Sequence, residues 1–190
     1  MLKKDCHTIR EIEHQPRMWE ETFQIIGRRR NEISGFFSRN GFDKASRIVF
    51  TGAGTSAFVA DSAAAVFMKD GFGGARSVAT TDIVSAPEFF ISPEDRFFVS
   101  FARSGNSPES VAAYKMVRKL CHEAIHLIIT CNPDGQLALE SDPEKDLVLV
   151  LPDGTNDRSL AMTSSYSSML IACLPALQEH RQSGPGECAA

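Results

Sequence analysis

Residues 47–70 read RIVFTGAGTSAFVADSAAAVFMKD, and this stretch decides the fold. Its first part, Arg47 to Thr51, is a short apolar segment with the β-branched and aromatic content of a buried strand. A glycine loop follows, and an alanine-rich segment with high helix propensity comes after the loop. The stretch therefore predicts a strand, a tight loop and a helix, which together are the building unit of an α/β domain.

The same alternation recurs along the chain. Four further apolar segments predict strands: ARSVATT (75–81), DRFFVSF (95–101), HLIITC (126–131) and DLVLVLP (146–152). Predicted helices over 107–120 and 164–177 follow the third and fifth strands. Because the strands lack strict alternation, we expect a parallel sheet that is covered on both faces. The fold class is therefore α/β, a doubly wound, flavodoxin-like sheet of five strands in the order 2-1-3-4-5 within three αβα layers.

The N-terminal part has a different pattern. Residues 16–40, PRMWEETFQIIGRRRNEISGFFSRN, predict one long helix opened by proline. Its apolar side consists of Trp19, Phe23, Ile26, Ile33 and Phe37. We expect an N-terminal helical segment over 1–45, one domain over 46–178 and an irregular tail over 179–190.

Composition excludes several classes of protein. The 190 residues are 43% hydrophobic, enough for an ordinary core, and the formal charge of −4 gives no basic excess for nucleic acid. No apolar stretch approaches the roughly 20 residues that span a bilayer, and the N-terminus lacks the apolar core of a secretory signal. Five scattered cysteines and five scattered histidines indicate reduced thiols and no metal site. These features predict a soluble cytoplasmic protein that binds neither nucleic acid nor membrane.

The loop Gly52-Ala53-Gly54-Thr55-Ser56 is the first candidate site. Its glycines permit a sharp turn and close backbone approach, and the helix that follows offers unpaired N–H groups and a partial positive charge to an anion. Thr55 and Ser56 add hydroxyl donors. Alternatively, Thr55 only caps the helix, and this loop alone does not separate the two interpretations.

A second loop, FARSGNSPES over 101–110, also joins a buried strand to a helix. Ser107 is in the position of a cap and Pro108 in that of the first helical residue. A cap needs one such residue, whereas this loop gathers Arg103, Ser104, Asn106 and Ser107, which favours a phosphate or sugar-hydroxyl site. The loops after strands one and three meet at the switch point of the predicted sheet, where ligands of doubly wound folds bind.

A third polar segment, Asp153 to Ser165, follows the fifth strand. It could close over a bound sugar, or it could be a connection in which Thr163 or Ser164 caps the last helix.

Four runs of sequence carry a resemblance to a known family: ATTDIVSAP (79–87), VSFARSGNSPESVAAYKM (99–116), ITCNPDG (129–135) and NDRSLAMTSS (156–165). Together with GAGTS they resemble the sugar isomerase (SIS) domain family over about residues 8–177. Within it they are similar to the tagatose/galactosamine 6-phosphate ketose-aldose isomerase or deaminase branch. The motifs are specific because several occur in the same order with matching contexts.

The resemblance implies a sugar 6-phosphate ligand, no cofactor, no metal, and a homodimer or larger homo-oligomer. Ala102 stands where relatives often have serine and Arg103 where glutamine is common, so we expect Arg103 to supply charge instead. The substrate-binding residues that follow from the resemblance and the loops are Gly54, Thr55, Ser56, Arg103, Ser104, Asn106, Ser107, Met162, Thr163 and Ser164.

Catalytic residues are not assigned. The resemblance is to proteins with two SIS domains in tandem, whose acid–base groups come largely from the second domain or a neighbouring subunit. On this resemblance we expect the chain to be either a truncated or frame-shifted product or one whose site a partner chain completes. Four residues are acid–base candidates by chemistry alone: Glu109, His122, His126 and Asp157.

The sequence features allow three functions. The first is an enzyme that interconverts aldose and ketose forms of a hexose or amino sugar 6-phosphate, with or without loss of ammonia, by proton transfer. The second is a module that binds a sugar phosphate without turnover. The third is an NAD-binding Rossmann domain, since Gly52 to Ala57 fits G-x-G-x-x-A and Asp82 follows the next strand. NAD binding leaves the second hydroxyl-rich loop unexplained.

Overall fold

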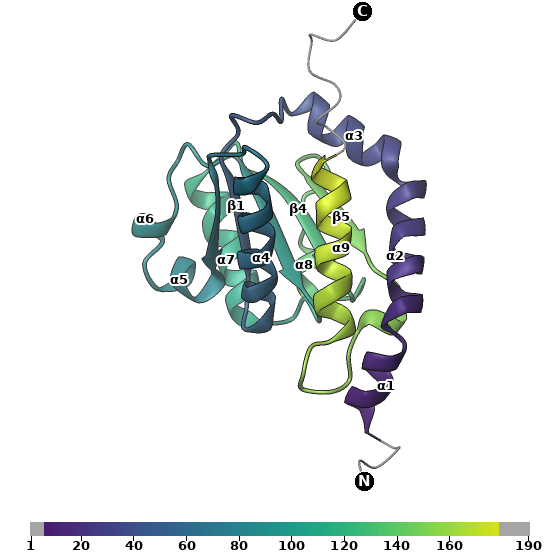
Figure 1. The fold of residues 1–190 in the computed structure, drawn as a ribbon. Helices are drawn as coiled ribbons and strands as arrows, with labels where there is room; N and C mark the ends of the chain where they lie inside the picture. Colours follow the sequence, from purple (N-terminus) through teal and green to yellow (C-terminus); the bar gives the residue numbers. More distant parts are fainter. Residues whose placement is uncertain (1–5, 179–190) are drawn as a thin grey trace, which may run out of the picture.

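A five-stranded parallel sheet forms the centre of the molecule (Figure 1). The computed structural model describes residues 6–178. The strands are β1 (Ile48–Gly52), β2 (Ala75–Ala79), β3 (Phe97–Ala102), β4 (Ile125–Thr130) and β5 (Asp146–Val150). Their order is β2-β1-β3-β4-β5, and every neighbouring pair is parallel. The predicted fold class and strand order are confirmed.

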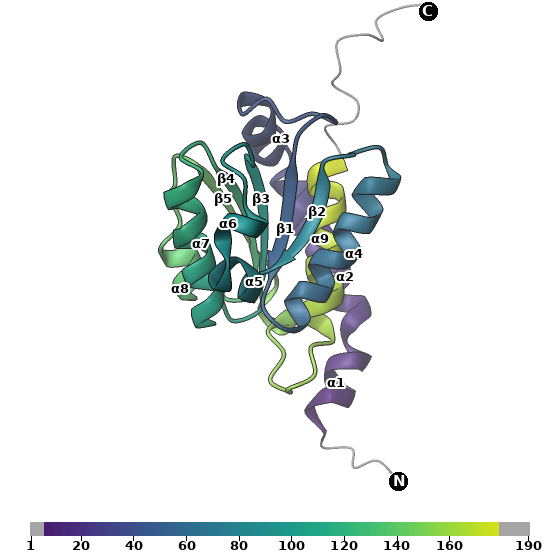
Figure 2. The ribbon, with the colours of Figure 1, turned by 90° about the vertical axis from the view of Figure 1, so that its left-hand side faces the viewer.

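Helices cover both faces of this sheet (Figures 1 and 2). Helices α4 and α9 cover one face, and α2 lies along the outside of α9. Helices α5 and α7 cover the other face. The helices are α1 (His7–Glu13), α2 (Gln15–Arg28), α3 (Arg30–Arg39), α4 (Thr55–Lys69), α5 (Thr80–Ser85), α6 (Pro87–Phe90), α7 (Pro108–Leu120), α8 (Gln136–Leu139) and α9 (Ser164–Gln178), with one 3-10 turn, η1 (Asp153–Thr155).

Burial on both faces explains the sequence pattern of the strands. Every residue of β1, β3 and β4 is buried. Neighbouring residues of β1 point to opposite faces: Phe50 joins a cluster with Phe67 of α4, whereas Val49 joins one with Val117 of α7. Both kinds of position must therefore be apolar, which is why these strands read as continuous apolar runs.

The N-terminal helix differs from the prediction, because two helices replace the single one expected over 16–40. The break falls at Arg29, two residues after a glycine, which is a poor helix former. Arg29 donates from Nη1 to the carbonyl oxygen of Val148 in β5 (2.6 Å) and pairs with Glu32. This bond attaches the break to the sheet, and α3 leaves the line of α2 there (Figure 1).

The predicted apolar side of this segment is only partly buried. Ile26, Ile33 and Phe37 lie in the core, but Phe23 is 53% exposed. Trp19 is half-buried and donates from Nε1 to the hydroxyl of Ser167 (2.8 Å), so it attaches α2 to α9 through a polar contact.

Three further findings concern the part of the chain that the structure describes. None of its helices is long and apolar enough to cross a membrane. Cys6, Cys121, Cys131 and Cys173 are free, and burial raises the pKa of the Cys121 thiol to about 11. The predicted irregular tail over 179–190 lies outside the described residues.

Candidate functional site

The two glycine-containing loops begin side by side at the carboxyl end of the sheet. Gly52, the last residue of β1, is paired in register with Phe101 of β3. One loop then leads into α4, a helix of 15 residues, and the other into α7, a helix of 13 residues. Two helix N-termini, each with a partial positive charge, are therefore brought to the same edge.

The first loop depends on two glycines. Gly54 has a φ of +54°, a conformation that L side chains rarely adopt. Gly52 has no room for a side chain, because a Cβ there would lie 2.5 Å from the backbone carbonyl of Ser56. This close approach fixes the first turn of α4 against the strand and leaves Ser56 buried at the base of the loop.

The second loop is held by the neighbouring β4–α8 connection. Gly105 has a φ of +68°, and a side chain at Gly135 would clash with the carbonyl oxygen of Ser104. The Asn132 side chain donates to the Ser104 carbonyl (2.9 Å), and the Leu137 amide donates to the Gly105 carbonyl (2.9 Å). Because protein contacts set its shape, a ligand would not have to supply the free energy that orders this loop.

A pocket of about 190 Å³ opens between the two loops. Its lining residues come from both loops, from the first turn of α7 and from the segment before α9. They are Ala53, Gly54, Ser56, Phe101, Ala102, Arg103, Ser104, Gly105, Ser107, Glu109, Ser110 and Met162. The lining thus combines several hydroxyls with one guanidinium and one carboxylate at the ends of two helices, which is the chemistry of an anion site.

Six of the predicted binding residues lie on this pocket: Gly54, Ser56, Arg103, Ser104, Ser107 and Met162. Ser107 stands at the N-cap position of α7, yet its hydroxyl donates to the Ser110 hydroxyl (2.6 Å) and does not accept a capping hydrogen bond from a backbone N–H of α7. Arg103 donates from Nη1 to the carbonyl oxygen of Ser159 (3.0 Å).

The other four predicted residues are absent from the pocket lining. Thr55 is the first residue of α4. Asn106 is exposed and accepts a hydrogen bond from the Gln136 amide (2.9 Å). Thr163 hydrogen-bonds to Asp157, and the buried Ser164 hydroxyl bonds to the carbonyl oxygen of Glu11 (2.7 Å).

Glu109 and Ser110 line the pocket but are not among the predicted binding residues, although Glu109 is one of the acid–base candidates. Ser110 follows Ser107 by three positions in the first turn of α7, and residues at that spacing lie on one side of a helix. The spacing in the sequence could have identified Ser110.

The Asp157 side chain caps the N-terminus of the last helix, α9, and does not line the pocket. Its carboxylate accepts hydrogen bonds from the amides of Thr163 (2.9 Å), Ser164 (3.2 Å) and Ser165 (2.9 Å), and from the hydroxyls of Thr163 (3.4 Å) and Ser165 (2.6 Å). These amides would otherwise be unpaired at the start of α9. Among the four acid–base candidates, Glu109 alone lines the pocket, while His122 is exposed.

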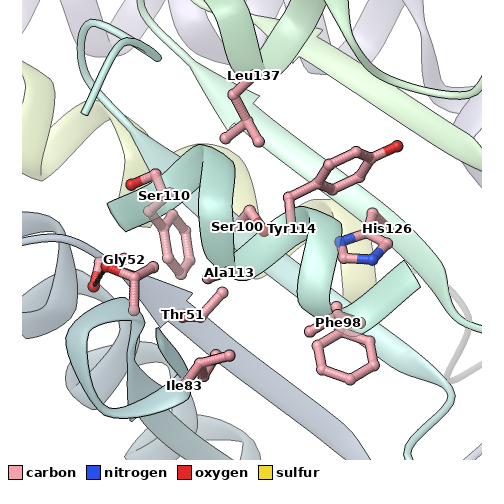
Figure 3. Close-up of a pocket in the computed structure, with 13 residues that line it drawn as sticks. Thr51, Gly52, Ile83, Phe98, Ser100, Ser110, Ala113, Tyr114, His126 and Leu137 are labelled. Atoms are coloured by element: carbon pink, nitrogen blue, oxygen red, sulfur yellow. Dashed lines mark hydrogen bonds between the residues drawn. The ribbon is translucent and has the colours of Figure 1, made fainter. Parts of the chain in front are cut away.

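His126 is buried beneath α7 beside a second, much smaller cavity (Figure 3). Its ring stacks on Phe98 (centroids 5.1 Å apart) and meets Tyr114 edge-on (4.8 Å). Neither ring nitrogen has a hydrogen-bond partner among residues 6–178, and burial together with nearby Arg118 holds the pKa of His126 well below its usual 6.5. With a volume of about 10 Å³ the cavity has room for about one water molecule, so it cannot hold a sugar.

A third pocket, of about 250 Å³, lies between α1 and the segment after β5. It has basic lining residues, among them Arg10 and Arg158, but the carboxylates of Glu11 and Asp153 also line it. The two carboxylates balance the two guanidinium groups, and the described lining of this pocket lacks the serine hydroxyls and the starts of α4 and α7 that line the pocket between the glycine loops. The pocket between the glycine loops therefore remains the candidate site. Within the described chain, no group of three or more His, Cys, Asp or Glu side chains could hold a metal ion.

The fold and the pocket define a doubly wound α/β domain with a ligand-sized pocket at the switch point of its sheet. The chain belongs to the SIS domain family, whose model matches residues 41–177. The D-galactosamine-6-phosphate deaminase AgaS of Escherichia coli is 40% identical over 171 residues, which are 88% of this chain and 44% of that protein. The chain thus spans less than half the length of the curated relatives it matches.

Solved structures also superpose on the fold of this chain. The tagatose-6-phosphate ketose/aldose isomerase of Escherichia coli superposes with a TM-score of 0.87 at 36% identity, covering 95% of this chain and 49% of that one. A phosphoheptose isomerase of Francisella tularensis superposes with a TM-score of 0.62 at 14% identity and covers 90% of this chain and 94% of that one. The second likeness shows the fold alone.

Proposed function

We propose that the pocket between the two glycine loops binds the phosphate group of a hexose or amino sugar 6-phosphate, such as tagatose 6-phosphate or galactosamine 6-phosphate. One observation carries the proposal: Ser56 and Ser107, from loops about 50 residues apart in sequence, line a single pocket at two helix N-termini. The AgaS relatives and the isomerase neighbour support this class of ligand.

In this proposal residues of both loops contact the phosphate. The helix-start amides and the hydroxyls of Ser56, Ser104 and Ser107 hydrogen-bond the phosphate oxygens, and Arg103 adds a positive charge. Gly54 lets the ligand approach the backbone, and Met162 contacts the sugar. Four predicted residues then support the shape of the site without contacting the ligand: Thr55, Asn106, Thr163 and Ser164.

The finer proposal is that the whole protein interconverts aldose and ketose sugar phosphates, or deaminates an amino sugar phosphate. Isomerisation moves a proton between C1 and C2 through an enediol, so it requires an acid–base group near the sugar. Glu109 is the carboxylate that the described part of the pocket offers for this task.

The second candidate is binding without turnover. Glu109 and Arg103 are the only ionisable side chains among the described lining residues that could exchange a proton or hold a charge at neutral pH, and arginine stays protonated. A single carboxylate favours a module that holds a sugar phosphate unless another chain or domain adds a second group. An NAD site is not proposed, for two reasons. The chain belongs to the SIS family, and a sugar phosphate accounts for the second hydroxyl-rich loop on the pocket, whereas NAD does not.

Isothermal calorimetry with galactosamine 6-phosphate, tagatose 6-phosphate and NAD tests these proposals on the full chain. We expect both sugar phosphates to bind and NAD not to bind, and Ser107→Ala to weaken binding by about 10- to 100-fold, the value of one charge-assisted hydrogen bond. Ser85→Ala is the matched control, because its exposed hydroxyl bonds within α5. Release of ammonia from galactosamine 6-phosphate, or formation of an aldose from tagatose 6-phosphate, supports the enzyme, and binding alone supports the module. Absence of sugar phosphate binding would refute both.

We also propose that the chain forms a homodimer or larger homo-oligomer. Large apolar side chains are exposed on its surface, among them Phe58, Phe89 and Leu160, and such side chains are common at subunit interfaces. Light scattering after size-exclusion chromatography should give at least twice the 20.8 kDa of one chain, and a monomer would refute the proposal.

A further inference from the structure

Glu11 is a buried carboxylate in a part of the chain that the SIS family model does not cover. It lies on α1, 30 residues before the matched range of 41–177, and is 6% exposed. Burying a carboxylate is unfavourable unless hydrogen bonds satisfy it. The partners of Glu11 therefore indicate what it does.

Within the described chain, the hydrogen bonds of the Glu11 carboxylate go to two consecutive residues of the segment that precedes α9. Its Oε1 accepts from the amides of Arg158 (2.7 Å) and Ser159 (3.1 Å), and its Oε2 accepts from the Ser159 hydroxyl. Burial acts to raise the pKa of Glu11, but these bonds outweigh it and lower the pKa, so the carboxylate is charged at neutral pH. The carboxylate thus clamps the backbone at 158–159.

Ser159 connects this clamp to the candidate site. Its carbonyl oxygen accepts the hydrogen bond from Arg103 Nη1 (3.0 Å), and Arg103 lines the pocket. Among the described residues this is the one hydrogen bond of the Arg103 side chain, so most of its N–H donors remain available to an anion. Three residues thus form a chain of contacts from α1 to the pocket.

The segment around Ser159 has little apolar packing, although Asp157 just before it is fixed by hydrogen bonds to the start of α9. Leu160 is 96% exposed, and Arg158 and Ala161 are also exposed. Apolar packing therefore cannot fix the backbone at this point, and the polar contacts must do so. An arginine side chain has many rotamers, so a fixed carbonyl is needed to hold its guanidinium in one place.

We propose that Glu11 is a positioning residue for phosphate binding. By fixing Ser159, it holds the guanidinium of Arg103 on the pocket with its free donors available to the phosphate. This inference rests on the proposed function, and it assigns a role in the site to the N-terminal helix α1.

The test compares variants of the full chain by calorimetry with galactosamine 6-phosphate. Glu11→Met keeps the volume but removes both acceptors, and we expect binding to weaken about 10-fold, part of the value of a charged hydrogen bond. Glu11→Gln should bind within about threefold of the wild type, because its amide oxygen still accepts from the backbone amides. Glu13→Met is the matched control on the same helix, since Glu13 is exposed, and it should leave binding unchanged.

A double-mutant cycle separates positioning from a general loss of structure. If Glu11 acts through Arg103, then Glu11→Met causes no further loss in an Arg103→Ala background. An equal loss in both backgrounds would overturn the inference, and so would wild-type affinity of Glu11→Met.

A measurement without ligand keeps this test independent of the proposed function. The Nε–Hε NMR resonance of Arg103 should shift or broaden in Glu11→Met and stay in place in Glu13→Met. An unchanged resonance in Glu11→Met overturns the inference. Failure of the wild type to bind any sugar phosphate would refute the proposed function, while the resonance would still decide whether Glu11 positions Arg103.

Discussion

Replacing Gly52 by alanine should damage the candidate site without touching a ligand. The new Cβ would lie 2.5 Å from the backbone carbon and oxygen of Ser56, whereas ordinary contacts begin at 3.4 Å. The first turn of α4 must then move by about 1 Å, because both elements are close-packed backbone with no flexible side chain to yield. Overpacking of this kind costs about 1–3 kcal/mol of unfolding free energy.

The same displacement should weaken phosphate binding. A shift of about 1 Å lengthens every hydrogen bond from the helix start and from Ser56, so we expect affinity for galactosamine 6-phosphate to fall about 10-fold. Urea unfolding measures the first effect and calorimetry the second. Gly35→Ala is the control, since nothing lies within 4 Å of its Cβ in α3, and it should stabilise the protein by about 0.5–1 kcal/mol with unchanged affinity. Wild-type affinity in a folded Gly52→Ala protein would refute the proposed role of the loop.

Two further predictions concern buried polar groups. Asp157→Ala removes the acceptor for three amides and two hydroxyls at the start of α9, and we expect it to lower the unfolding free energy in urea by about 2–4 kcal/mol. A change below about 0.5 kcal/mol would contradict this role. His126 has a folded pKa well below 6.5, so below that pH the unfolded chain takes up a proton that the folded chain does not. The unfolding free energy therefore does not depend on the titration of His126 above about pH 6.5. Below that pH, His126 makes the unfolding free energy fall by up to about 1.4 kcal/mol per pH unit. His126→Leu should reduce the slope of stability against pH between about 6.5 and 5, and an unchanged slope would show that His126 is protonated in the folded protein.

Much of the fold follows from the sequence because its signals are local. Each buried strand is a run of apolar residues, and glycines mark the turn after β1 and the loop after β3. The right-handed crossover rule and the alternation of strands and helices then leave few topologies, and the order 2-1-3-4-5 is among them. The break at Arg29 depends on a bond to Val148, which is distant in sequence, so helical periodicity cannot predict it.

The candidate site is predictable to the extent that backbone shape decides it. Ser56 and Ser107 reach one pocket because β1 and β3 are neighbours in register. Asn106 and Ser164 have the same kinds of polar group, but Gln136 and Glu11 engage them. Side-chain direction depends on such distant partners, and the composition of a loop does not reveal them.

The most direct measurement is a crystal structure of the full chain with galactosamine 6-phosphate. We predict that the phosphate lies between the glycine loops, with its oxygens about 2.7–3.0 Å from the hydroxyls of both Ser56 and Ser107. A phosphate bound beside Arg10 and Arg158 in the pocket next to α1, or held by only one of the two loops, would contradict the proposed site.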